Sequence, residues 1–270
     1  MAAIMLKHNR TIPQVYDWLK NKYRPLYPSH DFHCNGVIIS RRFVLTTAAC
    51  ILNKTSEVDK IRIRTGTNSL WDNEGETHEV QSYHVHNMTR IDSHITVVYT
   101  IGVYRLKKRL KVTNNQKPLR FAALPEAIII RDPWEIDIAF SGDWYGTVVG
   151  WGKERPLGPA TNVSPPPQYT VFTLRKMQET VVIERVPRCK RFIEQNGIPF
   201  NGHEICGYIH EKIGNDGAVL VYDNSLVGVA IHYRYEFYNG VKQRLTYGSI
   251  FAYIKKLESF INATVTDYYS

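Results

Sequence analysis

The chain has 270 residues, of which 43% are hydrophobic and 22% charged, so it can bury a substantial core and does not have a disordered composition. It contains no run of about 18 apolar residues, which predicts that no helix spans a membrane. The formal net charge of +9 favours polyanionic partners without choosing between nucleic acid, sulfated glycans and acidic membrane surfaces.

Most of the sequence features that bear on cellular location favour secretion, although the start of the chain does not. The apolar stretch within residues 1–8 is too short for the core of a signal peptide. However, five Asn-x-Ser/Thr sequons and an even number of cysteines, four, favour the secretory route. The candidate glycosylation sites are Asn9, Asn53, Asn87, Asn162 and Asn262. We therefore expect a secreted protein whose start has been trimmed or misassigned in this sequence.

The chain is dominated by short strand-like segments. Runs of β-branched and aromatic residues are separated by Gly, Pro, Asn and Asp, which predicts a β-sandwich or barrel. Residues 59–65 alternate between polar and apolar, as a half-buried strand does. Continuous apolar runs of strand length occur at 37–39, 43–45, 95–99, 147–149 and 219–221.

Helices are expected at two places, and an exposed loop at a third. Residues 158–167 include three successive prolines, which cannot donate to a sheet and predict a loop. A helix is predicted near 186–194, where Pro187 suits a first turn. Apolar residues at helical spacing between Ile250 and Ile261 predict a C-terminal helix.

Several segments, in a fixed order from about Cys34 to Phe260, resemble the trypsin-like serine protease family. They are 34–40 with 43–50, 117–125, the Gly-Trp-Gly motif at 150–152, 204–207, 214–221 and 226–229. The resemblance implies an all-β fold of two six-stranded antiparallel barrels, closed by a C-terminal helix. It implies an N-terminal segment at 1–30, one trypsin-like domain at 31–262 and a tail at 263–270. Within that domain the expected parts are barrels at 31–130 and 131–249 and a helix at 250–262.

The resemblance also implies how the cysteines pair, although four cysteines alone permit three pairings. The implied pairs are Cys34–Cys50 and Cys189–Cys206. Each closes a loop of roughly 15 residues, which is worth about 3 kcal/mol in the chain-entropy model. Four reduced core cysteines are the alternative.

The positions that the resemblance assigns to catalysis do not hold catalytic residues. Acyl transfer by this mechanism needs a nucleophile, a base and a carboxylate that orients the base. The base position, before the second cysteine, is Ala49. Asp216 stands at the nucleophile position, where the family has serine. The orienting carboxylate should precede a strand at 95–98, which gives His94, and Asp92 would fit only after a register shift.

The activation and specificity positions also differ from the family. Asn215 replaces the aspartate that pairs with the cleaved N-terminus in the family, and residues 9–15 lack the Ile-Val-Gly-Gly activation sequence. The former specificity pocket maps to His210, Ile231, His232 and Tyr233, and the tyrosine is expected to obstruct it.

An oxyanion-hole remnant is expected at Gly214 and Asp216. In one hypothesis the carboxylate of Asp216 accepts the N–H of Gly214 and so fills the hole. A metal site built from His94 and Asp216 would need at least one more ligand, so neither a metal nor a cofactor is predicted. Random decay of an unused site and a repurposed site both remain open.

A basic stretch is the second candidate site. Arg105, Lys107, Lys108, Arg109 and Lys111 place five cations within seven residues, and Lys117 and Arg120 follow. The stretch is either a solvated face near the join of the barrels or a docking site for heparin-like glycans, nucleic acid or an acidic protein. Nucleic acid is not the expected partner of a secreted protein. A smaller cluster, Arg188, Lys190 and Arg191, flanks Cys189.

The sequence therefore predicts a catalytically inactive serine protease homologue that is secreted and acts as a binding or regulatory protein. Such a protein would serve as a decoy or cofactor in a protease cascade, with an active protease or an inhibitor as its partner. One alternative is an active serine-type endopeptidase with displaced catalytic residues. The other is a polyanion-binding module that uses the stretch 105–120 and takes a sulfated glycan.

Overall fold

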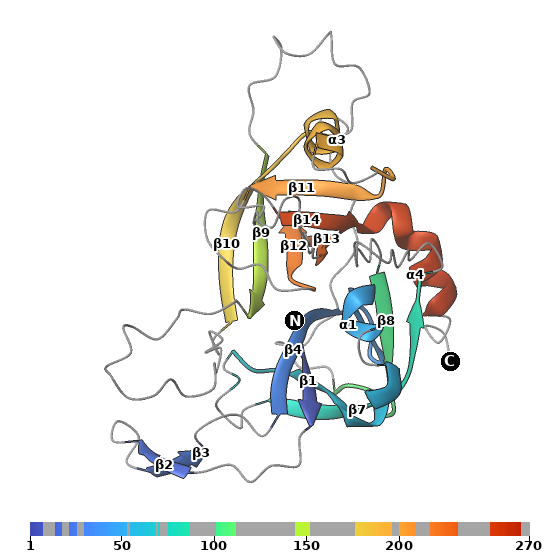
Figure 1. Cartoon of the computed structure of the whole chain (residues 1–270). Coiled ribbons are helices and arrows are strands. Elements are labelled where there is room, and N and C mark those ends of the chain that lie inside the picture. Colours follow the sequence, from blue (N-terminus) through green and yellow to red (C-terminus); the bar gives the residue numbers. More distant parts are fainter. Residues whose placement is uncertain are drawn as a thin grey trace, which may run out of the picture.

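The computed structural model describes residues 1–7, 14–17, 22–25, 30–52, 55–68, 70, 75–86, 101–111, 144–151, 176–195, 200–208, 217–231 and 249–265. These residues form two closed barrels of six antiparallel strands, which follow one another along the chain (Figure 1). The predicted fold class is confirmed.

The first barrel has the strand order β1-β4-β5-β8-β7-β6. Its strands are β1 (Ala2–Lys7), β4 (His30–Ile38), β5 (Phe43–Thr47), β6 (Ile61–Thr65), β7 (Glu76–Val85) and β8 (Ile101–Leu106). Helix α1 (Ala48–Leu52) and the 3-10 helix η1 (Thr55–Lys60) connect β5 to β6. A two-stranded sheet, β2 (Gln14–Asp17) with β3 (Lys22–Pro25), lies between β1 and β4 in the sequence.

Strand β1 shows that the first barrel begins earlier than expected. Ala2 pairs with Gly36 on β4 and with Thr65 on β6, so β1 closes the barrel. The assignment of residues 1–30 to a segment outside the trypsin-like domain is therefore wrong. Residues 9–15 come after the first barrel strand, whereas an activation sequence would precede the barrel. The lack of Ile-Val-Gly-Gly at 9–15 therefore says nothing about activation.

The burial of β1 explains why the sequence did not reveal it. Ala2 and Ile4 pack into the core of the first barrel, whereas Ala3 and Met5 pack on the opposite side with Leu70 and Trp151. A strand buried on both faces is apolar throughout and lacks the alternation that marks a half-buried strand.

The second barrel has the strand order β10-β11-β14-β13-β12-β9. Its strands are β9 (Trp144–Trp151), β10 (Lys176–Ile183), β11 (Glu204–Tyr208), β12 (Val219–Tyr222), β13 (Ser225–Ile231) and β14 (Ser249–Tyr253). Helix α3 (Val186–Gln195) follows β10, which confirms the helix predicted near 186–194. The 3-10 helix η2 (Ile254–Leu257) and helix α4 (Glu258–Thr264) follow β14.

The C-terminal helix exists but begins later than residue 250. Residues 250–253 belong to β14, the last strand that the structure describes in the second barrel, and α4 ends at Thr264. All four residues from Ile250 to Tyr253 are buried. A run of apolar residues fits a helical spacing as well as a strand, so Ile250 and Tyr253 were counted as part of the helix. The predicted strand at 59–65 is also shorter, since η1 extends to Lys60.

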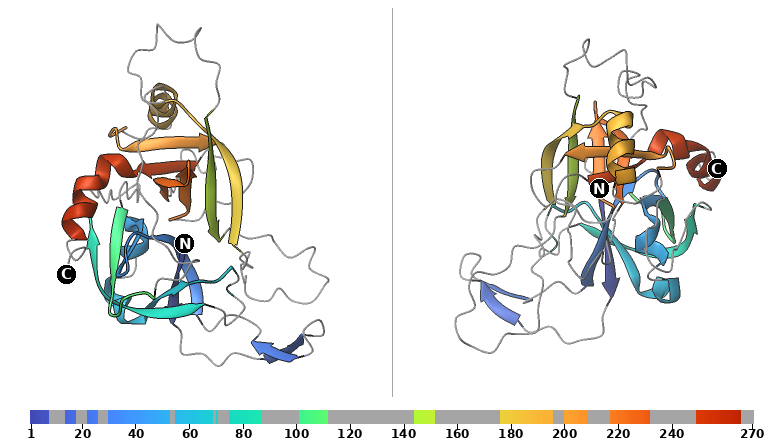
Figure 2. Two further views of the ribbon diagram at one scale, coloured as in Figure 1. Left: turned by 180° about the vertical axis from the view of Figure 1, so that it is seen from behind. Right: turned by 45° about the horizontal axis from the view of Figure 1, so that its top comes forward.

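Besides their separate cores, the two barrels share an apolar cluster where they meet. Val37, Leu45 and Val103 of the first barrel belong to the same buried cluster as Val219 and Val229 of the second. Helix α4 continues from the second barrel and lies beside the first, as both views in Figure 2 show. The rings of His86 and Phe260 meet edge to face there, with centroids 5.1 Å apart. Among the described helices, none is long and apolar enough to cross a membrane.

Candidate functional site at the seam between the barrels

Ala49 lies where the buried strand β5 turns into helix α1. All five residues of β5 are buried, and Ala49 itself is half-buried. The next residue, Cys50, forms a disulfide with Cys34 on β4, which confirms that predicted pairing. The alanine is therefore attached to a covalently anchored residue.

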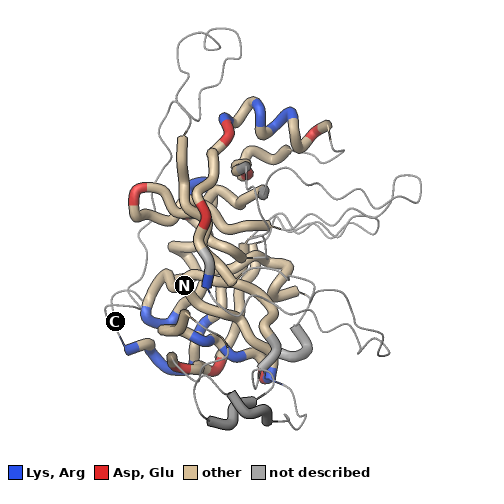
Figure 3. Tube along the Cα trace, turned by 90° about the vertical axis from the view of Figure 1, so that its left-hand side faces the viewer, with Lys and Arg blue, Asp and Glu red and all other residues tan. Residues whose placement is uncertain are grey.

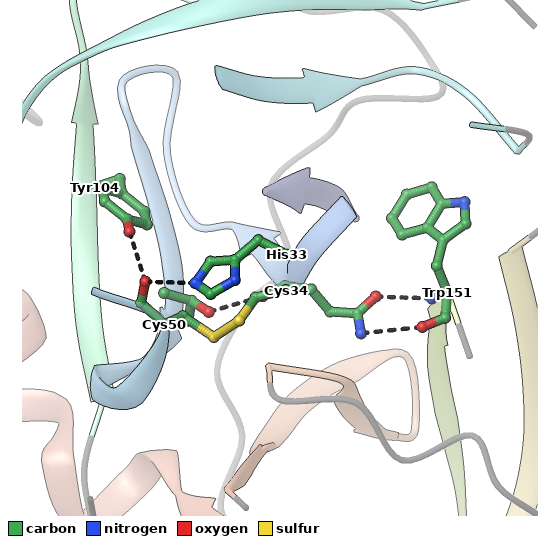
Figure 4. The surroundings of a disulfide bond; sticks show 7 residues. His33, Cys34, Cys50, Tyr104 and Trp151 are labelled. Carbon is green, nitrogen blue, oxygen red and sulfur yellow. Dashed lines mark hydrogen bonds between the residues drawn. A yellow bond between two sulfur atoms is a disulfide. The ribbon is translucent and has the colours of Figure 1, made fainter. Parts of the chain in front are cut away.

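Two side chains fix the backbone next to Ala49. The hydroxyl of Tyr104 on β8 donates to the carbonyl oxygen of Cys50 at 3.1 Å, and Nε2 of His33 lies 3.1 Å from the same oxygen (Figure 4). Burial, with a smaller effect of Tyr83, raises the pKa of Tyr104, so its hydroxyl stays protonated and remains a donor. The backbone beside Ala49 is thus held by two side chains. Ala49 itself provides no general base, because a methyl group accepts no proton.

Asn35 joins the two barrels one residue after Cys34. Its Oδ1 accepts the N–H of Trp151 on β9 at 2.7 Å, and its Nδ2 donates to the carbonyl oxygen of Trp151 at 3.3 Å (Figure 4). The hydroxyl of Thr46 on β5 donates to the carbonyl oxygen of Asn35 at 2.7 Å. The amide thus behaves like an additional piece of backbone between β4 and β9.

Gly217, which follows the predicted nucleophile position, lies against Asn35 and Thr46. Its φ is +81°, and a Cβ there would lie 2.0 Å from the carbonyl oxygen of Asn35 and 2.7 Å from Oγ1 of Thr46. Its N–H donates to the carbonyl oxygen of Ala230 at 2.9 Å. The residue that follows Asp216 in the sequence is therefore packed against the strand that leads to Ala49.

Most residues predicted for the old active site lie outside the described part of the chain. These are His94, His210, Gly214, Asn215, Asp216, His232 and Tyr233. Ile231 is described: it ends β13, is 5% exposed and pairs with Ile250. The assignments of these positions, including an oxyanion hole filled by Asp216, remain predictions.

The start of β8 bears on the position expected to hold the orienting carboxylate. The strand that pairs with β5 is β8, in which Ile101 lies opposite Thr47. Applied to β8, the expectation that this carboxylate precedes the strand would select Thr100, which also carries no carboxylate, so both His94 and Thr100 remain predictions for this position. The apolar run at 95–99 looked more strand-like than 101–106 because Gly102 interrupts the latter. Both Thr100 and the run 95–99 lie outside the described residues.

The remaining predictions have mixed outcomes. Cys189 of α3 and Cys206 of β11 form the second predicted disulfide. Of the five glycosylation candidates, only Asn262 is described, and it is exposed on α4. Across the described ranges, no group of three or more His, Cys, Asp and Glu residues could hold a metal ion.

The basic stretch is not one continuous strand. Arg105 is half-buried on β8, with its guanidinium carbon 6.0 Å from the centroid of the Phe43 ring. The strand ends at Leu106, and Lys107, Lys108, Arg109 and Lys111 lie beyond it with exposed side chains. Lys117 and Arg120 fall outside the described ranges.

The fold defines a protein of the double-barrel serine protease class, and comparison with known proteins specifies the family. The sequence model of the trypsin family matches residues 24–236, so the chain belongs to the trypsin family. A trypsin of the beetle Phaedon cochleariae is 28% identical over 214 residues, which cover 74% of this chain and 68% of the beetle protein.

Solved structures of the same fold include a serine protease and inactivated protease paralogues. Mouse neuropsin, a serine protease expressed in the limbic system of the brain, is 18% identical with a TM-score of 0.60; the match covers 86% of this chain and 89% of neuropsin. The scabies mite inactivated protease paralogue S-I1 is 18% identical with a TM-score of 0.58, over 98% of this chain and 94% of the mite protein. A second inactivated mite paralogue, S-D1, is 16% identical with a TM-score of 0.56, over 97% and 91%. At such identities these likenesses show the fold alone.

Proposed function

We propose that this chain is a catalytically inactive member of the trypsin family that acts as a secreted binding or regulatory protein. The observation that carries the proposal is Ala49, which stands in helix α1 directly before the disulfide-bonded Cys50. The resemblance assigns the general base to that position. Without a base in hydrogen-bond reach, a hydroxyl nucleophile on this scaffold is not activated.

Two further observations support the loss of catalysis. The residue before β8 is Thr100, so the rule for the orienting carboxylate selects a residue that cannot serve as one. The mite structures described as inactivated paralogues share this fold, so such a scaffold is compatible with a non-catalytic role. Asp216 at the predicted nucleophile position adds a third replaced group.

The disulfides and an exposed sequon support the proposed secretion, and the retained protease fold supports the proposed binding role. Two disulfides without a free cysteine among the described residues fit an oxidising compartment. The exposed Asn262 lies in a sequon on α4 and is available to a glycan. A protein that keeps the protease scaffold but cannot cleave would act by occupying the partners of an active relative, as a decoy or a cofactor.

A fluorophosphonate that labels activated serines tests the loss of catalysis. The whole chain, secreted with its disulfides formed, should remain unlabelled and should not cleave fluorogenic peptides, while the beetle trypsin treated in parallel reacts. The variant Ala49→His should remain unlabelled too, because the other catalytic positions are also replaced. Labelling of the natural chain that disappears when a single serine is changed to alanine would establish the displaced-residue enzyme instead.

The binding role needs a separate assay. The chain is added in excess to an active trypsin-family protease, with and without a protein inhibitor of that protease. A decoy relieves the inhibition, and a cofactor changes the cleavage rate when no inhibitor is present. If neither assay responds, the cascade role is wrong, whatever the labelling result.

A further inference from the structure

The exposed cations beyond β8 lie next to a second basic segment that is distant in the sequence. The hairpin between β4 and β5 contains Arg41 and Arg42. The N–H of Leu106 donates to the carbonyl oxygen of Arg42 at 2.8 Å, and the N–H of Leu110 donates to that of Arg41 at 2.7 Å. We define residues 41–42 with 107–111 as the two-segment basic surface. Figure 3 shows Lys and Arg gathered over the first barrel, in the lower part of the view.

Buried leucines hold this surface in one conformation. Leu106 and Leu110 are 0% and 4% exposed and belong to the core of the first barrel. The side chains between them therefore project outward from a segment fixed at both ends. A surface that is ordered before binding loses less conformational entropy when a ligand arrives.

Not every cation in the surface is equally available. The Nζ of Lys107 lies 2.9 Å from Oε2 of Glu79, and the guanidinium of Arg62 lies 3.6 Å from Oε1 of the same carboxylate. The hydrogen bond from Lys107, followed by the charges of Lys107, Arg62 and Lys108, lowers the pKa of Glu79, so this carboxylate is ionised at neutral pH. Lys107 is thus largely neutralised.

Arg41, Lys108 and Lys111 differ from Lys107 in this respect. Their side chains are exposed, and none of them forms a salt bridge with a carboxylate in the described part of the chain. They present positive charge from both segments on one side of the barrel. This arrangement favours a linear polyanion over a single small anion.

The second basic cluster, on α3, has a different charge balance. Arg188 pairs with Glu184, which precedes the helix, and Lys190 pairs with Glu194, each at 3.9 Å and four residues apart. These pairs offset part of the positive charge, since residues 184–195 hold four cations and two carboxylates, a net charge of +2. The α3 cluster therefore provides a control with similar residues and a weaker net attraction.

We propose that the two-segment basic surface binds a sulfated glycan of the heparin class, chiefly through Arg41, Lys108 and Lys111. This choice of ligand rests on the proposed secretion, which the two disulfides fit, because sulfated glycans rather than nucleic acids are the prevalent polyanions outside the cell. Sequence-tolerant binding of single-stranded nucleic acid uses exposed aromatic rings for stacking. Phe43 and Tyr104, the aromatic residues beneath this surface, are only 2% and 0% exposed.

The test compares two triple variants that change the net charge equally, since each replaces three cations by glutamate. Arg41→Glu, Lys108→Glu and Lys111→Glu alter the proposed surface, and Arg188→Glu, Lys190→Glu and Arg191→Glu alter α3. Their Kd values are measured with a heparin oligosaccharide over a range of NaCl concentrations. The first variant should bind at least about tenfold more weakly than the natural chain near 0.15 M NaCl. Its slope of log Kd against log salt should be smaller by about three, in analogy to counterion release from DNA.

Three single variants make the test sharper. Lys107→Gln should weaken heparin binding much less than Lys108→Gln, a change of equal charge, because Lys107 is already paired with Glu79. Glu79→Gln should strengthen binding, since it frees Lys107. Circular dichroism and thermal unfolding confirm that each variant is folded.

Three outcomes would overturn the proposal. Equal weakening by both triple variants would mean that only net charge matters. Equal binding of desulfated oligosaccharide would mean that sulfate is not recognised. Binding of DNA as tightly as heparin of matched charge would favour nucleic acid as the ligand. None of these outcomes bears on catalysis, so this proposal and the loss of activity stand or fall separately.

Discussion

The side-chain amide of Asn35 forms a two-hydrogen-bond bridge to the backbone of Trp151, and so joins strand β4 of one barrel to strand β9 of the other. Both residues are almost completely buried, at 0% and 1% exposure. Because a buried backbone group without a partner is costly, the amide of Asn35 stabilises this contact by pairing with both the N–H and the carbonyl oxygen of Trp151.

Replacement of Asn35 by alanine should therefore destabilise the protein. We expect the free energy of unfolding to fall by about 1–3 kcal/mol, the usual penalty for an unsatisfied buried polar group. Chemical denaturation of the oxidised protein measures the change. Gln178→Ala, on an exposed position of β10, should change the stability by less than about 0.5 kcal/mol. A similar loss in both variants would mean that the bridge contributes nothing specific.

Gly217 and Gly202 form a matched pair of variants that tests how tightly Gly217 packs against Asn35 and Thr46. Both have positive φ, +81° and +78°, so alanine is strained at either position by about 1–2 kcal/mol. Only at Gly217 would the added Cβ also overlap a backbone oxygen, that of Asn35, whereas nothing lies within 4 Å of a Cβ at Gly202. Gly217→Ala should thus lower the melting temperature clearly more than Gly202→Ala. Equal effects would show that the seam relaxes around the methyl group.

The sequence predicted the features that rest on covalent or strongly local signals. The order of motifs predicted both barrels, and the cysteine positions, through the resemblance, predicted both disulfides. It recognised some strands that are buried on both faces, such as residues 43–45, but failed for two others. Such strands have no alternation, so residues 2–7 were not recognised and residues 250–253 were assigned to a helix.

Contacts made only in three dimensions could not be predicted. No sequence pattern showed that Asn35 would reach Trp151, 116 residues away, or that Arg41 would lie beside Leu110. The orienting position was placed at His94 because the run 95–99 is apolar, whereas the pairing of β5 with β8 would select Thr100. Ala49 stays a prediction for the base position; the structure shows only that it lies in α1 directly before the disulfide-bonded Cys50.

The disulfide Cys34–Cys50 should contribute more to the candidate site than its loop length alone indicates. In the chain-entropy model a loop of this size is worth about 3 kcal/mol. Its removal in the double variant Cys34→Ala, Cys50→Ala also loosens the carbonyl oxygen that Tyr104 and His33 contact. Hydrogen exchange should therefore increase in α1 more than in α3. Uniformly faster exchange in both helices would show a global loss of stability without a local effect.

Glu204 predicts how stability depends on pH. Its carboxyl is 2% exposed, and burial raises its pKa above 4.5, although hydrogen bonds from Asn201 and His203 oppose the shift. The folded state then holds a proton that the unfolded state releases, so the contribution of Glu204 to stability is present below pH 4.5 and is lost as pH rises through the folded pKa. Glu204→Gln keeps an acceptor oxygen but removes this dependence. The melting temperature of the natural chain should fall relative to Glu204→Gln as pH increases above about 4.5. A difference between the natural chain and Glu204→Gln that stays constant over this pH range would contradict the assignment.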